Sequence, residues 1–225
     1  MTHLRARLDE SKPLLMPHVV FNTGNFIDAI GTAGFECVLL DCEHTAASVE
    51  RIDELCRAAR AARIFPIVRP ERLDGPIITR YLDCGAQGIM VPRIDSAAQA
   101  REFTAIMRYA RPDTHQRILT IAMIESGEAL DALDEILAVP DIDVFFVARN
   151  DLSKSLGYGD TKHHPEIRRI TDDTIARIIA AGHIAGAGAD LDNLATIAAS
   201  GTRLILVSTR EMFRAGAAQI LGALG

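Results

Sequence analysis

Eight short apolar segments recur along this chain of 225 residues, and each is followed by a segment with helical spacing, such as Val49–Ala62 or Asp173–Ala181. Continuous runs such as Val38-Leu39-Leu40 and Val144-Phe145-Phe146-Val147 are typical of strands that are buried on both faces, as in parallel sheets. Eight such units without a break predict one α/β domain over residues 1–225, a (β/α)₈ TIM barrel rather than a doubly wound sheet. The predicted strands are His18–Asn22, Cys37–Asp41, Phe65–Arg69, Gly88–Arg93, Ile118–Glu125, Val144–Ala148, Ile184–Ala189 and Leu204–Ser208.

The composition argues against several classes of partner. Lys and Arg number 24 against 30 Asp and Glu, and no basic block suggests that the chain binds nucleic acid. No apolar stretch approaches the roughly 18 residues of a membrane span, and the segment from Met1 to Lys12 lacks the apolar core of a signal peptide. The four cysteines form no CxxC pair, which favours a reduced, cytoplasmic protein. We therefore expect a small-molecule ligand, with neither nucleic acid nor membrane as a partner.

Charged side chains gather where the predicted strands end, which is where the active site of a TIM barrel lies. A charge buried there is costly unless it is paired or binds a metal. Two acids on neighbouring strands, with Arg and His on others, are typical of a Mg²⁺ or Mn²⁺ site that faces an oxyanion. Ion pairs between loops would explain the same residues. The segments concerned are Asp41-Cys42-Glu43-His44, Arg69-Pro70, Arg93, Glu125-Ser126 and Arg149-Asn150-Asp151.

The order of several motifs is more specific than any of them alone. They are Ala33-Gly34-Phe35, Leu40-Asp41-Cys42-Glu43-His44, Val68-Arg69-Pro70, Gly85-Ala86-Gln87-Gly88 with Val91-Pro92-Arg93, Ile124-Glu125-Ser126, and Asn150-Asp151-Leu152-Ser153 with Ser155-Leu156-Gly157. With these motifs the chain resembles the HpcH/HpaI family of class II, metal-dependent pyruvate aldolases, in the phosphoenolpyruvate/pyruvate barrel superfamily. The resemblance runs in order from about Leu8 to the C-terminus.

The resemblance implies a carbon–carbon lyase (aldolase) that cleaves or forms a 4-hydroxy-2-oxo acid through a pyruvate-type enolate. By the same resemblance, Glu125 and Asp151 bind the metal, Mg²⁺ or Mn²⁺ with Co²⁺ as a further candidate. Arg69 stabilises the enolate, and His44, supported by Asp41, deprotonates the 4-hydroxyl group. The chemistry is consistent, because a metal that chelates a 2-oxo acid provides the electron sink for breaking the C3–C4 bond.

Four departures from the family pattern put the substrate, and in part the reaction, in doubt. Met123 replaces a Gln, and Ala148-Arg149 replaces a Gly-Pro step. The segment from Arg108 to Ile118 is short, and we expect the loss of an insert that covers the site. The eighth strand ends in Val207-Ser208-Thr209-Arg210, and Cys42 replaces a Gly. A 2-oxo acid decarboxylase, an acyl-CoA lyase and a non-catalytic binding or assembly barrel therefore remain alternatives.

Three further residues are candidates for substrate binding, namely Arg93, Arg149 and Asn150, although a structural role is an equal alternative for the two arginines. His163-His164 precedes Pro165 and fits the cap of a helix better than a metal site. Cys42 fits a small filler better than a nucleophile.

The last predicted helix, Glu211 to Leu224, has an apolar face that includes Met212, Phe213 and Ile220. In the superfamily the eighth helix is commonly exchanged between subunits. By resemblance we expect a homo-oligomer, a dimer or a hexamer, with this helix swapped.

Overall fold

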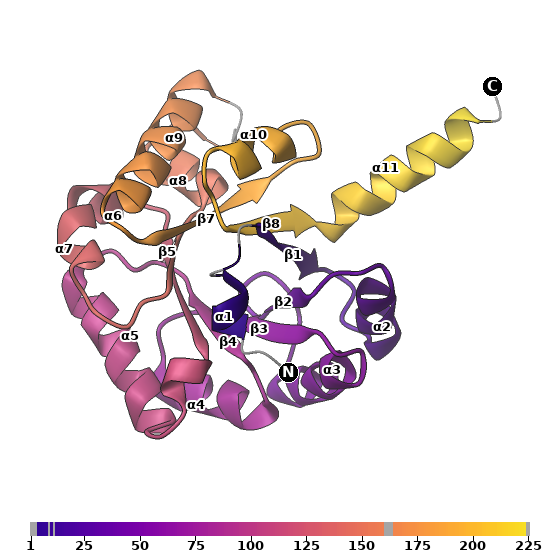
Figure 1. Ribbon diagram of the computed structural model, residues 1–225, viewed down its shortest axis with the longest axis horizontal. Coiled ribbons are helices and arrows are strands. Elements are labelled where there is room, and N and C mark those ends of the chain that lie inside the picture. The colour runs from indigo at the N-terminus through magenta and orange to yellow at the C-terminus, as the bar shows by residue number, and fades with distance from the viewer. Residues whose placement is uncertain (1–3, 9, 11, 160–163, 224–225) are drawn as a thin grey trace.

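The computed structural model describes residues 4–8, 10, 12–159 and 164–223. Eight parallel strands close into a barrel in chain order, β1 to β8, with β1 pairing with β8, and helices surround it (Figure 1). The predicted (β/α)₈ barrel is therefore confirmed. The strands are β1 (Leu14–Val19), β2 (Cys37–Asp41), β3 (Phe65–Arg69), β4 (Gly88–Val91), β5 (Leu119–Ile124), β6 (Val144–Val147), β7 (Ile184–Ala189) and β8 (Leu204–Ser208).

The helices occupy the connections between the strands and the two ends of the chain. They are α1 (Leu4–Leu8), α2 (Gly24–Thr32), α3 (Val49–Ala61), α4 (Gly75–Cys84), α5 (Ala97–Ala110), the 3₁₀ helix η1 (His115–Arg117), α6 (Gly127–Asp131), α7 (Leu133–Leu137), α8 (Arg149–Ser155), α9 (Pro165–Ala180), α10 (Leu194–Ala199) and α11 (Thr209–Gly222). None of the described helices is long and apolar enough to cross a membrane.

The first strand lies earlier in the chain than the sequence predicted. We expected His18–Asn22, whereas β1 covers Leu14–Val19 and pairs with β8 from Leu14 through His18. Pro17 cannot donate a ladder hydrogen bond, yet the pairing continues on both sides of it. The shift matters because His18 lies near the end of its strand rather than at the beginning.

Helix α9 begins at Pro165, as the expected helix cap just before this proline implies. His164 caps it, with its Nδ1 accepting a hydrogen bond from the backbone N–H of Glu166 at 3.2 Å. The expected cap role of His164 is thus confirmed, whereas His163 lies outside the described residues.

The barrel interior contains alternate residues of each strand, since successive side chains of a strand point to opposite faces. Leu14 and Met16 of β1 and Cys37 and Leu39 of β2 belong to one buried apolar cluster, which also includes Leu4 of α1. Helix α1 lies across one end of the barrel in Figure 1. The next inward positions along the strands, at the other end, belong to polar residues.

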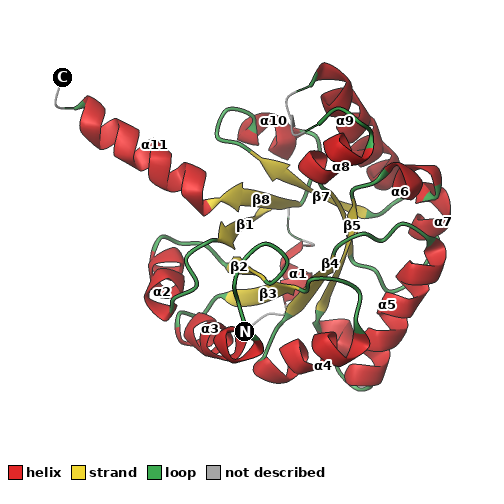
Figure 2. Cartoon of the chain, turned by 180° about the vertical axis from the view of Figure 1, so that it is seen from behind, coloured by secondary structure: helices red, strands yellow, loops and turns green. Residues whose placement is uncertain are grey.

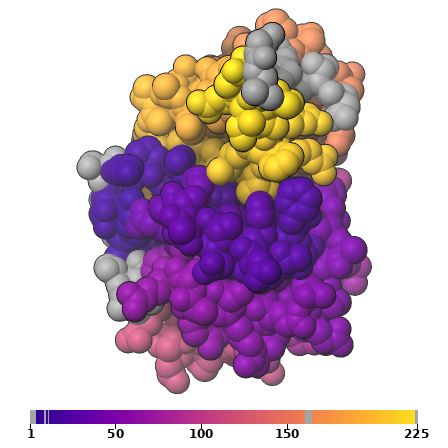
Figure 3. Space-filling view, turned by 90° about the vertical axis from the view of Figure 1, so that its right-hand side faces the viewer, coloured from indigo at the N-terminus to yellow at the C-terminus, as the bar shows by residue number. Residues whose placement is uncertain are grey.

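Helix α11 departs from the pattern of the other helices. It projects away from the barrel (Figures 1 and 2), and Figure 3 views it nearly end-on. Only Thr209 of this helix is buried, whereas Phe213 and Ile220 are 71% and 70% exposed.

Candidate active site

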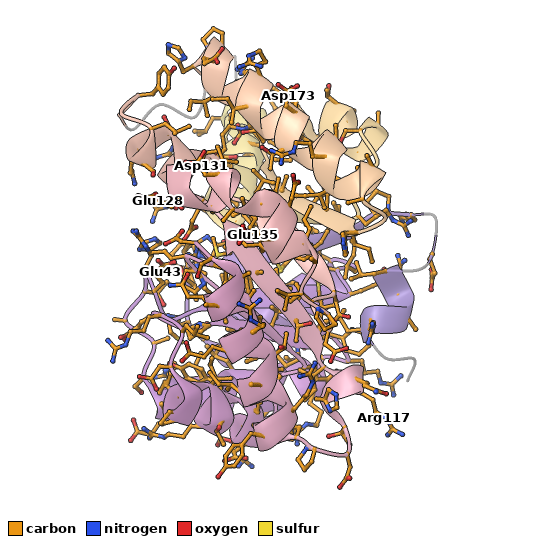
Figure 4. The ribbon with its side chains drawn as sticks, turned by 90° about the vertical axis from the view of Figure 1, so that its left-hand side faces the viewer. Glu43, Arg117, Glu128, Asp131, Glu135 and Asp173 are labelled. Atoms are coloured by element: carbon orange, nitrogen blue, oxygen red, sulfur yellow. The ribbon has the colours of Figure 1, made fainter. Side chains whose placement is uncertain are left out.

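A cavity of about 340 Å³ opens where the strands end, at the face opposite α1. Among its lining residues, His18, Arg69 and Ser208 come from the ends of three strands, and Asp151 comes from the first turn of α8, the helix after β6. Figure 4 shows the barrel from the side, with Glu43 at this end and Arg117 at the opposite one.

The position of Arg117 corrects one expectation about the shortened segment. The stretch from Arg108 to Ile118 precedes β5, so it lies at the end of the barrel away from the cavity (Figure 4). An insert at this point could not cover the site of its own chain, so its absence does not by itself open the pocket.

Asp41 is fully buried and connects three strands. Its Oδ1 accepts a hydrogen bond from Nε of Arg69 at 2.9 Å, and its Oδ2 accepts one from Nη2 of Arg69 at 2.8 Å. Nε2 of His18 lies 2.9 Å from the same Oδ2. Burial alone would raise the pKa of Asp41, but the hydrogen bonds from His18 and Arg69 outweigh it and hold the pKa well below its usual range. Asp41 is therefore ionised.

Arg69 is held by two acids. Besides the bidentate pair with Asp41, its Nη1 lies 3.2 Å from Oε2 of Glu43. A guanidinium fixed in this way keeps its charge and its orientation, which suits it to bind an oxyanion or a carboxylate.

His44 is the most exposed of the predicted catalytic residues. Its side chain is 57% exposed, and its Nε2 lies 3.6 Å from Oε2 of Glu43. Asp41 supports it through the backbone, because Oδ1 of Asp41 accepts from the His44 N–H at 3.4 Å. The imidazole that Asp41 contacts is that of His18.

Sequence reasoning missed His18 for a definite reason. With the strand placed at residues 18–22, His18 stood at its beginning, far from any active site. The alternation of inward residues Leu14 and Met16 would have placed His18 third, at the end that carries the site. The spacing of the apolar residues Leu14 and Met16, two positions apart before Pro17, is the sequence feature that could have revealed it.

Glu125 and Asp151 form an electrostatically strained pair of acids. Glu125 is 5% exposed, and burial together with the charges of Asp151 and Glu43 raises its pKa to about 7. A cation between such carboxylates would relieve this repulsion, and two carboxylates with waters and substrate oxygens are a usual ligand set for Mg²⁺. No group of three or more His, Cys, Asp or Glu with metal-site geometry occurs among the described residues. The residues thus fit a metal that takes its remaining ligands from substrate and water.

Arg93 contributes its backbone rather than its side chain. Its N–H donates to Oε1 of Glu125 at 2.8 Å, while its side chain is 72% exposed. The backbone of Arg93 has a φ of 54°, a conformation that non-glycine residues rarely adopt. Strain of this kind persists where the surrounding structure holds it, often at functional sites.

Arg149 and Asn150 both line the cavity, at the start of α8. Burial lowers the pKa of Arg149, and the charges that act on it are those of Asp172, Asp190 and Arg168. Its buried Nε has no hydrogen-bond partner in the described part of the chain.

Two of the substituted positions have simple surroundings. Met123 lines the cavity and belongs to the interior apolar cluster. Cys42 is buried in the outer core, and burial raises the pKa of its thiol to about 11. A thiol that stays protonated is a poor nucleophile, which agrees with the expected filler role.

Comparison with known proteins identifies the family. The profile described as HpcH/HpaI aldolase/citrate lyase matches residues 15–216. The chain belongs to this family. The predicted family and the predicted enzyme class, a lyase of the aldolase type, are therefore confirmed.

The family relatives agree in sequence and in structure. A 2-keto-3-deoxy-L-rhamnonate aldolase of Escherichia coli O1:K1 is 35% identical over 187 residues, which cover 73% of this chain and 70% of the relative. The structure of citrate synthase SbnG has a TM-score of 0.89 at 26% identity, covering 98% of this chain and 97% of that one. A family protein from Burkholderia cenocepacia J2315 has a TM-score of 0.91 at 24% identity and covers 98% of both chains.

Proposed function

We propose that this family member is a metal-dependent aldolase that cleaves or forms a 4-hydroxy-2-oxo acid through a pyruvate-type enolate. The observation that carries the proposal is the position of Arg69. This buried cation is fixed by Asp41 and Glu43, and the charges that act on it include Glu125. An enolate oxygen needs a fixed positive group at this place, because preorganised charge stabilises a developing anion without reorganisation.

Glu125 and Asp151 would hold the divalent metal, Mg²⁺ or Mn²⁺. The metal, when bound, supplies a Lewis acid that polarises the 2-oxo group. The backbone N–H of Arg93 fixes the Glu125 carboxylate in the required orientation. Arg69 binds the oxygen on which charge develops while the C3–C4 bond breaks.

His44 is the group to which the family resemblance assigns the proton of the 4-hydroxyl. Its exposure places the ring at the mouth of the cavity, where the aldehyde part of the substrate would leave. Arg149 and Asn150 also line the cavity and would contact the substrate. Binding of an acid is favoured by Arg69, Arg149 and Lys154, which are among the lining residues.

A homo-oligomer is also part of the proposal. The projecting helix α11, with its exposed Phe213 and Ile220, is expected to pack on a second copy of the chain. Large apolar side chains gathered on one projecting element are a usual sign of an interface.

The test combines a substrate assay with two substitutions. Purified protein with Mg²⁺ and a 4-hydroxy-2-oxo acid should release pyruvate and an aldehyde, and Glu125→Gln and Asp151→Asn should each abolish this release. The release of CO₂ from oxaloacetate without any aldolase activity would indicate a decarboxylase instead. Turnover that survives both substitutions and a chelator would contradict the proposed function.

A further inference from the structure

His18 lines the cavity with a titratable imidazole, and the proposed chemistry assigns no role to this side chain. Its side chain is 21% exposed and lines the cavity. Because Asp41 is ionised, its carboxylate can only accept, so Nε2 of His18 carries the hydrogen of their 2.9 Å contact. Nδ1 therefore keeps its lone pair whenever the ring is neutral. In the part of the chain that the structure describes, this Nδ1 atom has no hydrogen-bond partner.

Asp41 also places His18 beside the cation that binds the enolate. Oδ2 of Asp41 accepts from Nη2 of Arg69 at 2.8 Å as well as from His18, so both side chains are bonded to one oxygen atom. In the enolate, C3 is bonded directly to C2, which carries the oxygen that Arg69 would bind. A ring anchored beside Arg69 is thus positioned for chemistry at C3.

His44 also faces an oxygen that contacts Arg69, Oε2 of Glu43, but its ring is more exposed and its contact is longer. It lies in the turn after β2, its ring is largely exposed, and its contact is with Glu43 at 3.6 Å. A ring that is 57% exposed and loosely held suits the outer, aldehyde end of the substrate, whereas the His18 ring is 21% exposed and firmly anchored to Asp41. We therefore assign the two histidines to different parts of a 4-hydroxy-2-oxo acid.

We propose that His18 is a catalytic acid/base residue that transfers the proton at C3 of the enolate, while His44 handles the 4-hydroxyl proton. This inference rests on the proposed function. In cleavage, His44 takes the hydroxyl proton, the C3–C4 bond breaks, and its electron pair remains in the enolate. His18, protonated on Nδ1, then gives that proton to C3 and forms the methyl group of pyruvate. His18 recovers a proton from water, and His44 releases one to water.

The charges around His18 are compatible with this cycle. Asp41 on β2 is negative and is bonded to Nε2, so it fixes the orientation of the ring. Arg69 on β3 is bonded to the same carboxylate, and Glu211, at the start of α11, lines the same cavity. Ser208 of β8, opposite His18 in register, carries no charge.

Two substitutions of His18 distinguish a role in proton transfer from a purely structural role as a hydrogen-bond donor to Asp41. His18→Gln keeps an N–H donor for Asp41 and removes the titratable ring, whereas His18→Phe removes both. His44→Gln is the matched control on the other histidine. Each variant is first compared with wild type for Mg²⁺ binding by calorimetry and for thermal unfolding, so that misfolded protein is recognised.

The first assay follows exchange of the pyruvate methyl protons with D₂O by proton NMR, in the presence of Mg²⁺. The second follows aldehyde release from 4-hydroxy-2-oxopentanoate while hexacyanoferrate(III) oxidises the enolate, so that C3 protonation is bypassed. We expect His18→Gln and His18→Phe to slow exchange about 100-fold, a usual contribution of an acid/base group. Aldehyde release with the oxidant should stay within about threefold of wild type in His18→Gln. His44→Gln should show the opposite pattern.

Three results would overturn the inference. Exchange in His18→Gln that stays close to wild type, with loss only in His18→Phe, would show that His18 merely supports Asp41. Loss of exchange in His44→Gln alone would assign C3 to His44. In both cases the proposed aldolase function would stand. If the wild-type protein with Mg²⁺ exchanged no pyruvate protons, the proposed function and this inference would fail together.

Discussion

Asp41 and Arg69 form a bidentate ion pair that is closed to solvent, with N–O distances of 2.9 and 2.8 Å. The pair lies between neighbouring strands, where Asp41 and Arg69 are partners in register. Such a pair does more for orientation than for stability, because both charges lose their hydration on burial. Its loss, however, leaves one buried charge without its partner.

This ion pair predicts how the free energy of unfolding depends on pH. The folded pKa of Asp41 lies below its unfolded value of about 3.9, so its contribution is present above that pH and is lost as the pH falls toward the folded pKa. Asp41→Asn should lower the free energy of unfolding at pH 7 by about 3 kcal/mol. The difference between variant and wild type should shrink below about pH 4. Urea unfolding at pH 7 and pH 3 measures both, and a difference independent of pH would contradict the assignment.

The acid pair at the proposed metal site predicts the opposite dependence. The pKa of Glu125 is raised to about 7, above its unfolded value of about 4.3, so its contribution is present at low pH and is lost as the pH rises toward 7. Metal-free wild type should therefore lose stability relative to Glu125→Gln between pH 5 and pH 8. Mg²⁺ or Mn²⁺ should restore it at pH 8.

Thermal unfolding with and without metal provides that measurement. The control is Glu128→Gln, an acid on α6 that lies outside the cavity lining and should leave the metal effect unchanged. An equal metal-induced rise of the melting temperature in wild type and in Glu125→Gln would argue against Glu125 as a ligand.

The backbone conformation of Arg93 predicts that this position tolerates substitution by glycine. Because the side chain is exposed and only the N–H contacts Glu125, Arg93→Gly should keep kcat/KM within about threefold and change stability by less than about 1 kcal/mol. Arg93→Pro removes the N–H and should abolish turnover. A large rise of KM in Arg93→Ala would instead show that the guanidinium binds substrate, as the sequence allowed.

Arg149 predicts a gain in stability on substitution. Its Nε is buried without a partner in the described structure, and burial lowers its pKa. Arg149→Met should raise the free energy of unfolding by about 1 kcal/mol, since an unsatisfied buried donor costs that much or more. If Arg149 also binds the substrate, KM should rise while kcat changes little. Lower stability together with unchanged kinetics would mean that its role is structural.

The sequence predicted the barrel well, because buried parallel strands read as apolar runs and the intervening helices have their own period. It placed β2, β3, β7 and β8 at the residues found. It failed at β1, where Pro17 interrupts the pattern, and this error concealed His18. Spacing alone could not show that the Asp41 carboxylate reaches the ring of His18 and only the backbone of His44.

Arg93 illustrates a second limit of sequence reasoning. An arginine at a strand end suggests a charge for a ligand, and nothing in the residue type indicates that its backbone N–H supports Glu125. Roles that depend on φ and on main-chain donors are set by the tertiary structure, so the residue type alone does not reveal them.

The projecting helix α11 predicts an oligomer that depends on named side chains. Phe213 and Ile220 are largely exposed in the single chain, and burying such side chains stabilises an interface by roughly 1.5–3 kcal/mol each. Sedimentation at micromolar concentration should show at least a dimer, which Phe213→Asp with Ile220→Asp should dissociate. Tyr109→Asp is the control, because Tyr109 is 86% exposed at the end of α5. A wild-type monomer at that concentration, or dissociation by the control alone, would contradict the role of α11.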